Sequence, residues 1–114
     1  MKTLQKLPEY LLDREGYPTD EWLQFIKDYK PDESLPILTF IREFLINGWW
    51  MSDWGIKIHR QYKKIIKLEL HTGGWSGNED IIEAILSNIY LTHFSMKYIK
   101  WLAGGHYYFE IYVK

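Results

Sequence analysis

The spacing of hydrophobic residues changes near Gly48, and this change divides the chain into two segments. Before Gly48, apolar residues recur every three or four positions, which is typical of amphipathic helices. After it, apolar and polar residues alternate, which is typical of strands with one buried face. The pattern predicts a single domain over residues 1–114, with a helical segment at 1–47 and a strand-rich segment at 48–114.

Two helices are predicted before residue 30. The first is marked by leucines at helical spacing and ends before Gly16 and Pro18, which break the pattern. Those leucines are Leu4, Leu7, Leu11 and Leu12. Thr19 is a suitable N-cap for the second helix, from about Asp20 to Tyr29, because its hydroxyl can accept a bond from a free backbone N–H.

A third helix is predicted after Pro31. Ser34 would cap it, Pro36 would lie in its first turn, and Asn47-Gly48 would end it in a left-handed conformation. Its apolar stripe would be Ile37, Phe40, Ile41, Phe44 and Leu45.

Two strands are expected around residues 54–59 and 66–71, joined by a turn at Gln61-Tyr62-Lys63. Trp54, Ile56 and Ile58 would share one side of the first strand. A glycine loop, residues 73–77, then leads into a helix for which Ser76 and Glu79 form a capping box. The apolar positions of this helix would be Ile81, Ile82, Ile85 and Ile89.

The chain ends in two further alternating stretches, separated by the turn signal Ala103-Gly104-Gly105. Phe94, Met96 and Tyr98 mark the first of these strands. The predicted fold is therefore α+β: N-terminal helices followed by β-β-α-β-β, forming one four-stranded antiparallel sheet with the helices packed on one face.

Composition narrows the range of functions. The chain is 46% hydrophobic and 25% charged, and its net charge of −1 argues against nucleic acid as a partner. The absence of cysteine excludes disulfides, thiolate nucleophiles and Cys-type zinc sites. No apolar run reaches the ~20 residues that span a bilayer. The start of the chain also lacks the features of a signal peptide, so we expect a cytoplasmic protein without a membrane partner.

The aromatic content is high, with nine Tyr, six Trp and five Phe. Most of these rings should fill the core. Six indoles nevertheless exceed what a core of this size usually buries, so some should line an interface. The candidate partner-binding residues are Trp49, Trp50, Trp54 and Trp101.

The densest polar motif lies between the second strand and its helix. Glycines and a helix N-terminus can together present backbone N–H groups to an anion. The candidate ligand-binding residues of this loop are His71, Thr72, Gly73, Gly74, Trp75, Ser76, Gly77 and Asn78. Asn78 and Glu79 follow Gly77 where a P-loop requires lysine and a hydroxyl residue. The alternative is a structural turn with Trp75 as a packing plug.

Two basic residues of the first hairpin, Arg60 and Lys64, could neutralise such a ligand, in a stretch that has no acidic residue between positions 57 and 67. The alternative is that these cations form a solvated face that protects the hairpin from edge pairing.

The four histidines have no metal-binding spacing, so neither a metal site nor a cofactor is expected. His71 ends one predicted strand and His106 begins another. If those strand ends are neighbours, the two imidazoles could form an acid–base group with Glu79 or Asp80. The alternative is a pair of ordinary hydrogen-bonded or exposed histidines.

Two stretches, HTGGWSGNEDIIEAI at residues 71–85 and GGHYYFEI at residues 104–111, resemble a family of short uncharacterised proteins encoded by bacteriophages and prophages. The resemblance covers Gly48 to Val113 and implies a protein that acts in the host cell cytosol. It implies no catalytic or binding role for any residue.

The favoured hypothesis is therefore a phage-encoded accessory protein that binds or inhibits a host protein without catalysis, for example in counter-defence. The first alternative is a protein that binds or sequesters phosphate or a nucleotide through the Gly73–Asn78 loop. The second is a small hydrolase that uses His71 and His106.

Overall fold

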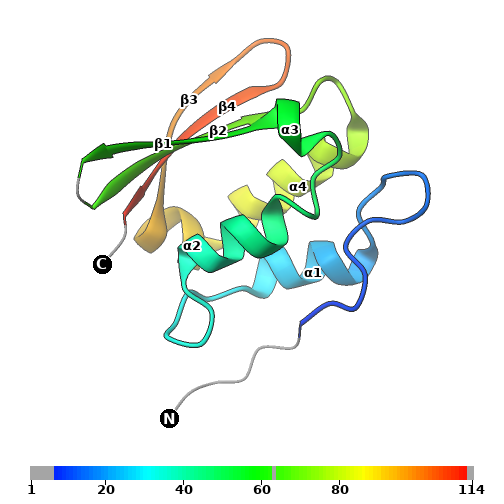
Figure 1. Ribbon diagram of the computed structural model, residues 1–114, viewed down its shortest axis with the longest axis horizontal. Coiled ribbons are helices and arrows are strands. Elements are labelled where there is room, and N and C mark those ends of the chain that lie inside the picture. The colour runs from blue at the N-terminus through cyan, green and yellow to red at the C-terminus, as the bar shows by residue number, and fades with distance from the viewer. Residues whose placement is uncertain (1–6, 63, 113–114) are drawn as a thin grey trace.

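A four-stranded antiparallel sheet lies against a layer of helices in the computed structural model, which describes residues 7–62 and 64–112 (Figure 1). The strands follow the order β1-β2-β4-β3 across the sheet. They are β1 (Ile56–Tyr62), β2 (Ile65–His71), β3 (Met96–Leu102) and β4 (His106–Tyr112). The predicted α+β fold, with N-terminal helices followed by β-β-α-β-β, is confirmed.

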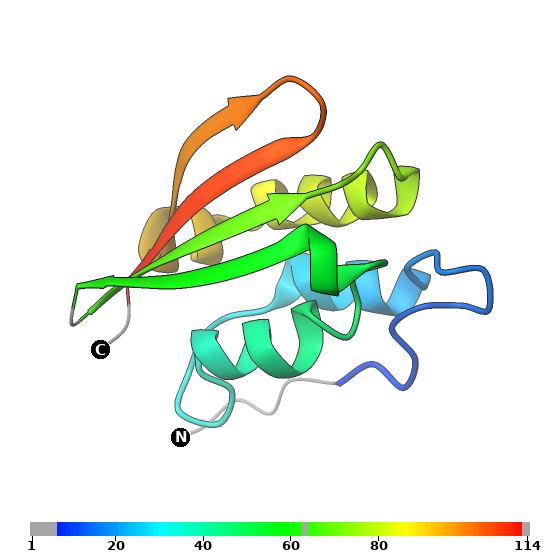
Figure 2. The ribbon, with the colours of Figure 1, turned by 45° about the horizontal axis from the view of Figure 1, so that its top comes forward.

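The helical elements lie on one side of this sheet, and no helix or strand of the described residues covers its other side, here called the bare face (Figure 2). A short α2 continues directly into the π-helix η1, and the π-helix η2 leads into β3. The elements are α1 (Asp20–Asp28), α2 (Ile37–Thr39), η1 (Phe40–Leu45), α3 (Ser52–Gly55), α4 (Ser76–Ser87) and η2 (Leu91–Ser95). None of the helices in the described part of the chain is both long and apolar enough to span a membrane.

Helix α1 begins as predicted. The N–H of Trp22 donates to the Thr19 hydroxyl at 3.1 Å, which confirms Thr19 as the N-cap. The apolar face of α1 is fully covered, and the indole N–H of Trp22 donates to the carbonyl of Gly48 at 3.1 Å. A Cβ at Gly48 would collide with the Trp22 ring. Gly48 therefore allows close packing and does not form the predicted left-handed helix end, because its φ is not positive.

The predicted first helix is wrong for residues 7–12, and its Leu4 lies outside the described residues. This stretch is irregular and reaches an isolated bridge between Leu12 and Pro18. The Glu21 carboxylate accepts the N–H groups of Glu9 and Tyr10, at 3.0 and 3.2 Å. These tertiary hydrogen bonds hold the backbone open, and they outweigh the helical spacing of the leucines.

The third predicted helix has the expected buried stripe but a different beginning. Asp32 accepts hydrogen bonds from Ser34 and Leu35, so Ser34 lies in a turn and Pro36 is the N-cap of α2. Ring stacking then joins this helix to α1, with the Tyr29 and Phe40 centroids 4.1 Å apart. The Tyr29 hydroxyl donates to Leu35 at 2.6 Å, and burial together with Asp32 raises its pKa far above the ordinary value.

Alternation along β2 determines which face of the sheet meets the helices. Its even-numbered residues are buried, and they pair with inward residues of β4. The inward set of the two central strands is Ile66, Leu68, Leu70, Phe109 and Ile111. The odd-numbered residues of β2 point to the bare face, where Glu69 pairs with Tyr108 and His71 pairs with His106.

Two strand boundaries differ from the prediction. Trp54 lies in α3, because Gly55 ends a short helical turn before β1 begins at Ile56. Phe94 lies in η2, and the strand begins at Met96. The hairpin turn lies between Tyr62 and Ile65, later in the chain than predicted, because Gln61 and Tyr62 still belong to β1. Lys63, the third residue of the predicted turn, lies outside the described residues.

Candidate functional site

The two glycine-rich bends lie side by side at one end of the sheet, here called the bend end, formed by residues 71–78 and 103–106 (Figure 1). His71 at the end of β2 is paired with His106 at the start of β4. The N–H of Thr72 donates to the carbonyl of Gly105 at 2.9 Å. Both glycine-rich motifs therefore contribute to one site.

Glu79 connects the two bends through its carboxylate. The Thr72 hydroxyl donates to it at 2.7 Å, and the Tyr107 hydroxyl donates at 3.2 Å. Burial and the Glu79 charge raise the pKa of Tyr107. The predicted capping box is wrong, because α4 begins at Ser76, Trp75 is its N-cap, and no side chain bonds to the cap.

On the bare face of the sheet, three histidines and Glu69 form a chain of contacts. The two carboxylate oxygens of Glu69 lie 3.0 Å from Nε2 of His59 and 3.2 Å from Nε2 of His71. Nδ1 of His71 lies 2.7 Å from Nδ1 of His106. The predicted convergence of His71 and His106 is confirmed, but the carboxylate that orients them is Glu69 rather than Glu79 or Asp80.

The donor and acceptor roles in this chain of contacts depend on the tautomers of the imidazoles. If Glu69 is ionised it can only accept, and Nε2 of His71 then carries a hydrogen directed at Glu69. In neutral His71, Nδ1 must then accept from Nδ1–H of His106. Nε2 of His106 is left with its lone pair, and it makes no hydrogen bond within residues 7–62 and 64–112.

Trp75 is a packing plug at the start of α4. Its ring is stacked between Tyr17 and Trp50, with centroids at 4.5 and 4.6 Å. Its indole N–H donates to Gly16 at 3.3 Å. Next to it, buried Asn78 exchanges two hydrogen bonds of 3.0 Å with the backbone of Trp50.

These contacts occupy the anion site that the sequence suggested. A Cβ at Gly77 would lie 2.8 Å from Pro18, so the first turn of α4 is covered by the chain itself. Gly73 and Gly74 remain exposed with positive φ, and the side chain of Trp54 lies against Gly73. The local geometry therefore matches the structural alternative, a tight turn with Trp75 as its plug.

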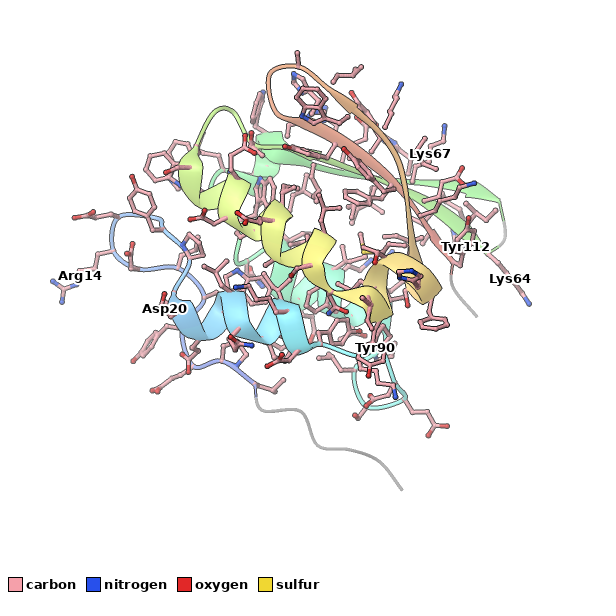
Figure 3. All side chains as sticks on the ribbon, turned by 180° about the vertical axis from the view of Figure 1, so that it is seen from behind. Arg14, Asp20, Lys64, Lys67, Tyr90 and Tyr112 are labelled. Atoms are coloured by element: carbon pink, nitrogen blue, oxygen red, sulfur yellow. The ribbon has the colours of Figure 1, made fainter. Side chains whose placement is uncertain are left out.

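Arg60 and Lys64 are not brought to the loop. Lys64 lies at the hairpin end of β2, and seven residues of strand place it about 23 Å from His71 at ~3.3 Å per residue. Arg60 pairs with Ile66, close to that same far end. Figure 3 shows Lys64 at the hairpin tip, with Lys67 pointing away from the helical layer.

The candidate tryptophans separate into buried and exposed groups. Trp49 is 2% exposed, which corrects its assignment as a partner-binding residue, because its ring belongs to the core. Trp54 and Trp101 are 52% and 54% exposed at the bend end, and Trp50 is partly exposed. Met51, which lies between Trp50 and Trp54 in the chain, has a left-handed φ of 60°. Among the described residues it is the one non-glycine residue with a positive φ.

Sequence reasoning did not identify Glu69, Tyr107 or Tyr108 at this site. Glu69 and Tyr108 face each other across β2 and β4, and Tyr108 meets His71 edge to face at 6.0 Å. Strand alternation places His71 and Glu69 on one face, so this signal could have found the carboxylate.

Within residues 7–62 and 64–112, no group of three or more metal-ligating side chains could hold an ion. No protein family, curated protein or solved structure matches this chain.

Proposed function

We propose that this protein binds a host protein without catalysis, through an exposed aromatic surface at the bend end. We call this surface the rim, formed by Trp50, Met51, Trp54, Trp101 and Leu102, all of which are exposed large hydrophobic residues. The observation that carries the proposal is that more than half of Trp54 and of Trp101 is exposed to solvent.

Contact of this apolar surface with water is unfavourable in free energy, and a partner that covers the surface removes that contact. Indoles concentrate binding energy at protein interfaces, and single anchors of this kind can contribute ~2 kcal/mol or more. Large exposed apolar surfaces on small proteins commonly mark interaction sites. The left-handed Met51 supports the same conclusion, because strained backbone persists where the surroundings enforce a particular presentation of side chains.

The host-cell setting of the proposal comes from the resemblance to phage and prophage proteins. A small accessory protein of that origin would act by occupying a host component, and counter-defence is one such role. The rim supplies the contact surface that this mode of action requires.

Affinity capture from a host lysate tests the proposal. The wild-type chain should retain one stoichiometric partner, and Trp54→Ala or Trp101→Ala should lower retention about tenfold or more, as expected for loss of an aromatic anchor. Phe94→Ala is the matched control, because Phe94 is 75% exposed but belongs to η2, away from the rim. Capture that is lost equally in the Phe94→Ala variant would contradict a rim interface.

A second candidate function is acid–base hydrolysis at His106. The distance of 2.7 Å between the imidazoles, with Glu69 behind His71, favours it because this is the carboxylate–imidazole arrangement that holds a base in one tautomer. Turnover of chromogenic ester and phosphate substrates should disappear in both His71→Ala and His106→Ala. Exposed His93 provides the control, and activity that survives both substitutions eliminates the histidine mechanism.

Binding of a phosphate or nucleotide at the Gly73–Asn78 loop has less support. The first turn of α4 is already covered by Pro18 and Trp75, and the two basic residues proposed to assist lie at the other end of the sheet.

A further inference from the structure

Strand β3 lies at the edge of the sheet and has an unpaired backbone side. It pairs with β4, and the N–H of Met96 also donates to the carbonyl of Leu91 in η2. In the described residues 7–62 and 64–112, no backbone group outside β4 hydrogen-bonds to Lys97–Leu102. An open row of N–H and C=O groups is a template for an added strand. Figure 2 shows that the turn joining β3 and β4 stands away from the helices.

The two faces of β3 present different chemistry. Tyr98 pairs with Phe109 and Trp101 pairs with Tyr107, so these two rings lie on the helix side, yet both are exposed. Lys97 pairs with Glu110 and Lys100 pairs with Tyr108, so both lysines lie on the bare face. The strand thus offers aromatic surface on one side and positive charge on the other.

The opposite edge of the sheet lacks this combination. The helix-side residues Ile56 and Ile58 of β1 pack against the core, while Lys57 and His59 are exposed on its other side. Only β3 combines an open backbone with uncovered aromatic rings in the described part of the sheet.

Charge around β3 indicates the chemistry of the partner. Glu110 lies between Lys67 and Lys97 in the register, and Lys100 lies 4.7 Å from the ring centroid of Tyr108. Glu69 is aligned with Lys100 through Tyr108, so this part of the bare face has three lysines for two carboxylates, and both lysines of β3 lie at its outer edge. A strand beside β3 would place its own bare-face residues next to Lys97 and Lys100, where acidic side chains are favoured.

We propose that β3 is the docking edge for an extended segment of the partner protein that alternates acidic and apolar residues. Main-chain hydrogen bonds would extend the sheet to a fifth strand, the acidic residues would face Lys97 and Lys100, and the apolar residues would cover Tyr98 and Trp101. This inference rests on the proposed binding function and specifies its mode.

A second copy of the chain fits this edge poorly. Pairing β3 with itself would bring the Lys97 and Lys100 pairs of both copies onto the same face, and like charges on neighbouring strands are destabilising. Sedimentation should therefore show no dimer that depends on β3. A dimer that disappears when the edge is altered would make the second copy the occupant and overturn the proposal.

The test uses the full chain and a short peptide of alternating glutamate and valine, called the glutamate peptide. A second peptide, in which each glutamate is replaced by lysine, is called the lysine peptide and serves as its comparison. At peptide concentrations up to about 1 mM, the weak limit of specific binding, the glutamate peptide should bind and slow hydrogen exchange of β3 amides about tenfold or more. The double variant Lys97→Glu/Lys100→Glu should lose this binding about tenfold and prefer the lysine peptide.

The matched control is Lys57→Glu/Lys64→Glu, which reverses two exposed charges on the hairpin of β1 and β2, away from β3. It should bind the glutamate peptide within about twofold of wild type. Absence of binding, binding without protection of β3, or equal loss in both double variants overturns the inference. Capture of the host protein that needs Trp54 but survives Lys97→Glu/Lys100→Glu would leave the proposed function standing and remove only the docking edge.

Discussion

Tryptophan occurs in two contrasting environments in this molecule. In the helical layer, Trp22 is 0% exposed and its N–H is bonded to Gly48, so the whole side chain contributes to folding. At the bend end, Trp54 leaves half its surface in solvent although its ring lies against Gly73. The comparison shows that folding covers all of Trp22 but only about half of Trp54, and the uncovered half is apolar surface that a partner can contact.

The largest effect is expected in the helical layer. Trp22→Ala removes a buried ring and leaves the Gly48 carbonyl without its donor, which should lower the free energy of unfolding by about 3–5 kcal/mol. That is a large part of the ~5–15 kcal/mol typical of a small domain. Urea denaturation followed by circular dichroism measures the loss. A loss below about 1 kcal/mol would contradict the contrast between a buried Trp22 that stabilises the fold and an exposed Trp54 that does not.

The next effect tests whether the bend end is rigid. Gly105 and Gly74 both have positive φ, but a Cβ at Gly105 would meet the Thr72 hydroxyl, whereas a Cβ at Gly74 meets nothing within 4 Å. Gly105→Ala should cost about 2–3 kcal/mol through strain and collision. Gly74→Ala should cost only about 1 kcal/mol, from the backbone alone.

The difference between these two glycine variants, measured by the same urea titration, isolates the contact between the bends. Equal losses in both variants would mean that the Thr72–Glu79 connection relaxes freely. The bend end would then be softer than its hydrogen bonds indicate.

Two tyrosines extend the comparison to pH. Burial raises the pKa of Tyr29 in the folded state, so the phenol stabilises the fold fully below its unfolded pKa of about 10 and loses that contribution as pH rises above it. Tyr29→Phe removes the bond to Leu35 and should cost about 1 kcal/mol at neutral pH. Its stability should also fall less steeply than that of the wild type above pH ~10.

Tyr107→Phe is the matched change at the bend end. The pKa of Tyr107 is raised by the same causes, burial and a nearby carboxylate, but its side chain is only partly buried. The alkaline slope should therefore change less than in Tyr29→Phe. Thermal melts at a series of alkaline pH values measure how stability falls with pH in each variant. A larger change in slope for Tyr107→Phe than for Tyr29→Phe would contradict the prediction.

Local signals predicted local structure well. The Thr19 cap, the stripe of α1 and the alternation of β2 follow from short-range chemistry, and the structure has all three. The convergence of His71 and His106 was predicted only on the condition that their strand ends are neighbours, and the pairing of β2 with β4 meets that condition.

The errors have a common physical cause, since tertiary partners outweighed local patterns. Ser76 and Glu79 have capping-box spacing, but Glu79 bonds instead to Thr72 and Tyr107, which come from another part of the chain. Leu11 and Leu12 have helical spacing, but hydrogen bonds to Glu21 hold the stretch just before them irregular. The neighbouring residues Trp49 and Trp50 differ in burial, and amino-acid composition alone cannot predict which of two tryptophans lies in the core.

The smallest effect on stability, and the most informative, is expected for Trp54→Ala. Because half of the ring is already in solvent, its removal should change the free energy of unfolding by no more than about 0.5 kcal/mol. The same variant should lose its host partner, so a stability curve that overlays the wild type and a failed capture together define an interface residue. If Trp54→Ala instead destabilises the chain as much as Trp22→Ala does, the rim is part of the core. Its exposed indoles would then need no partner to account for them.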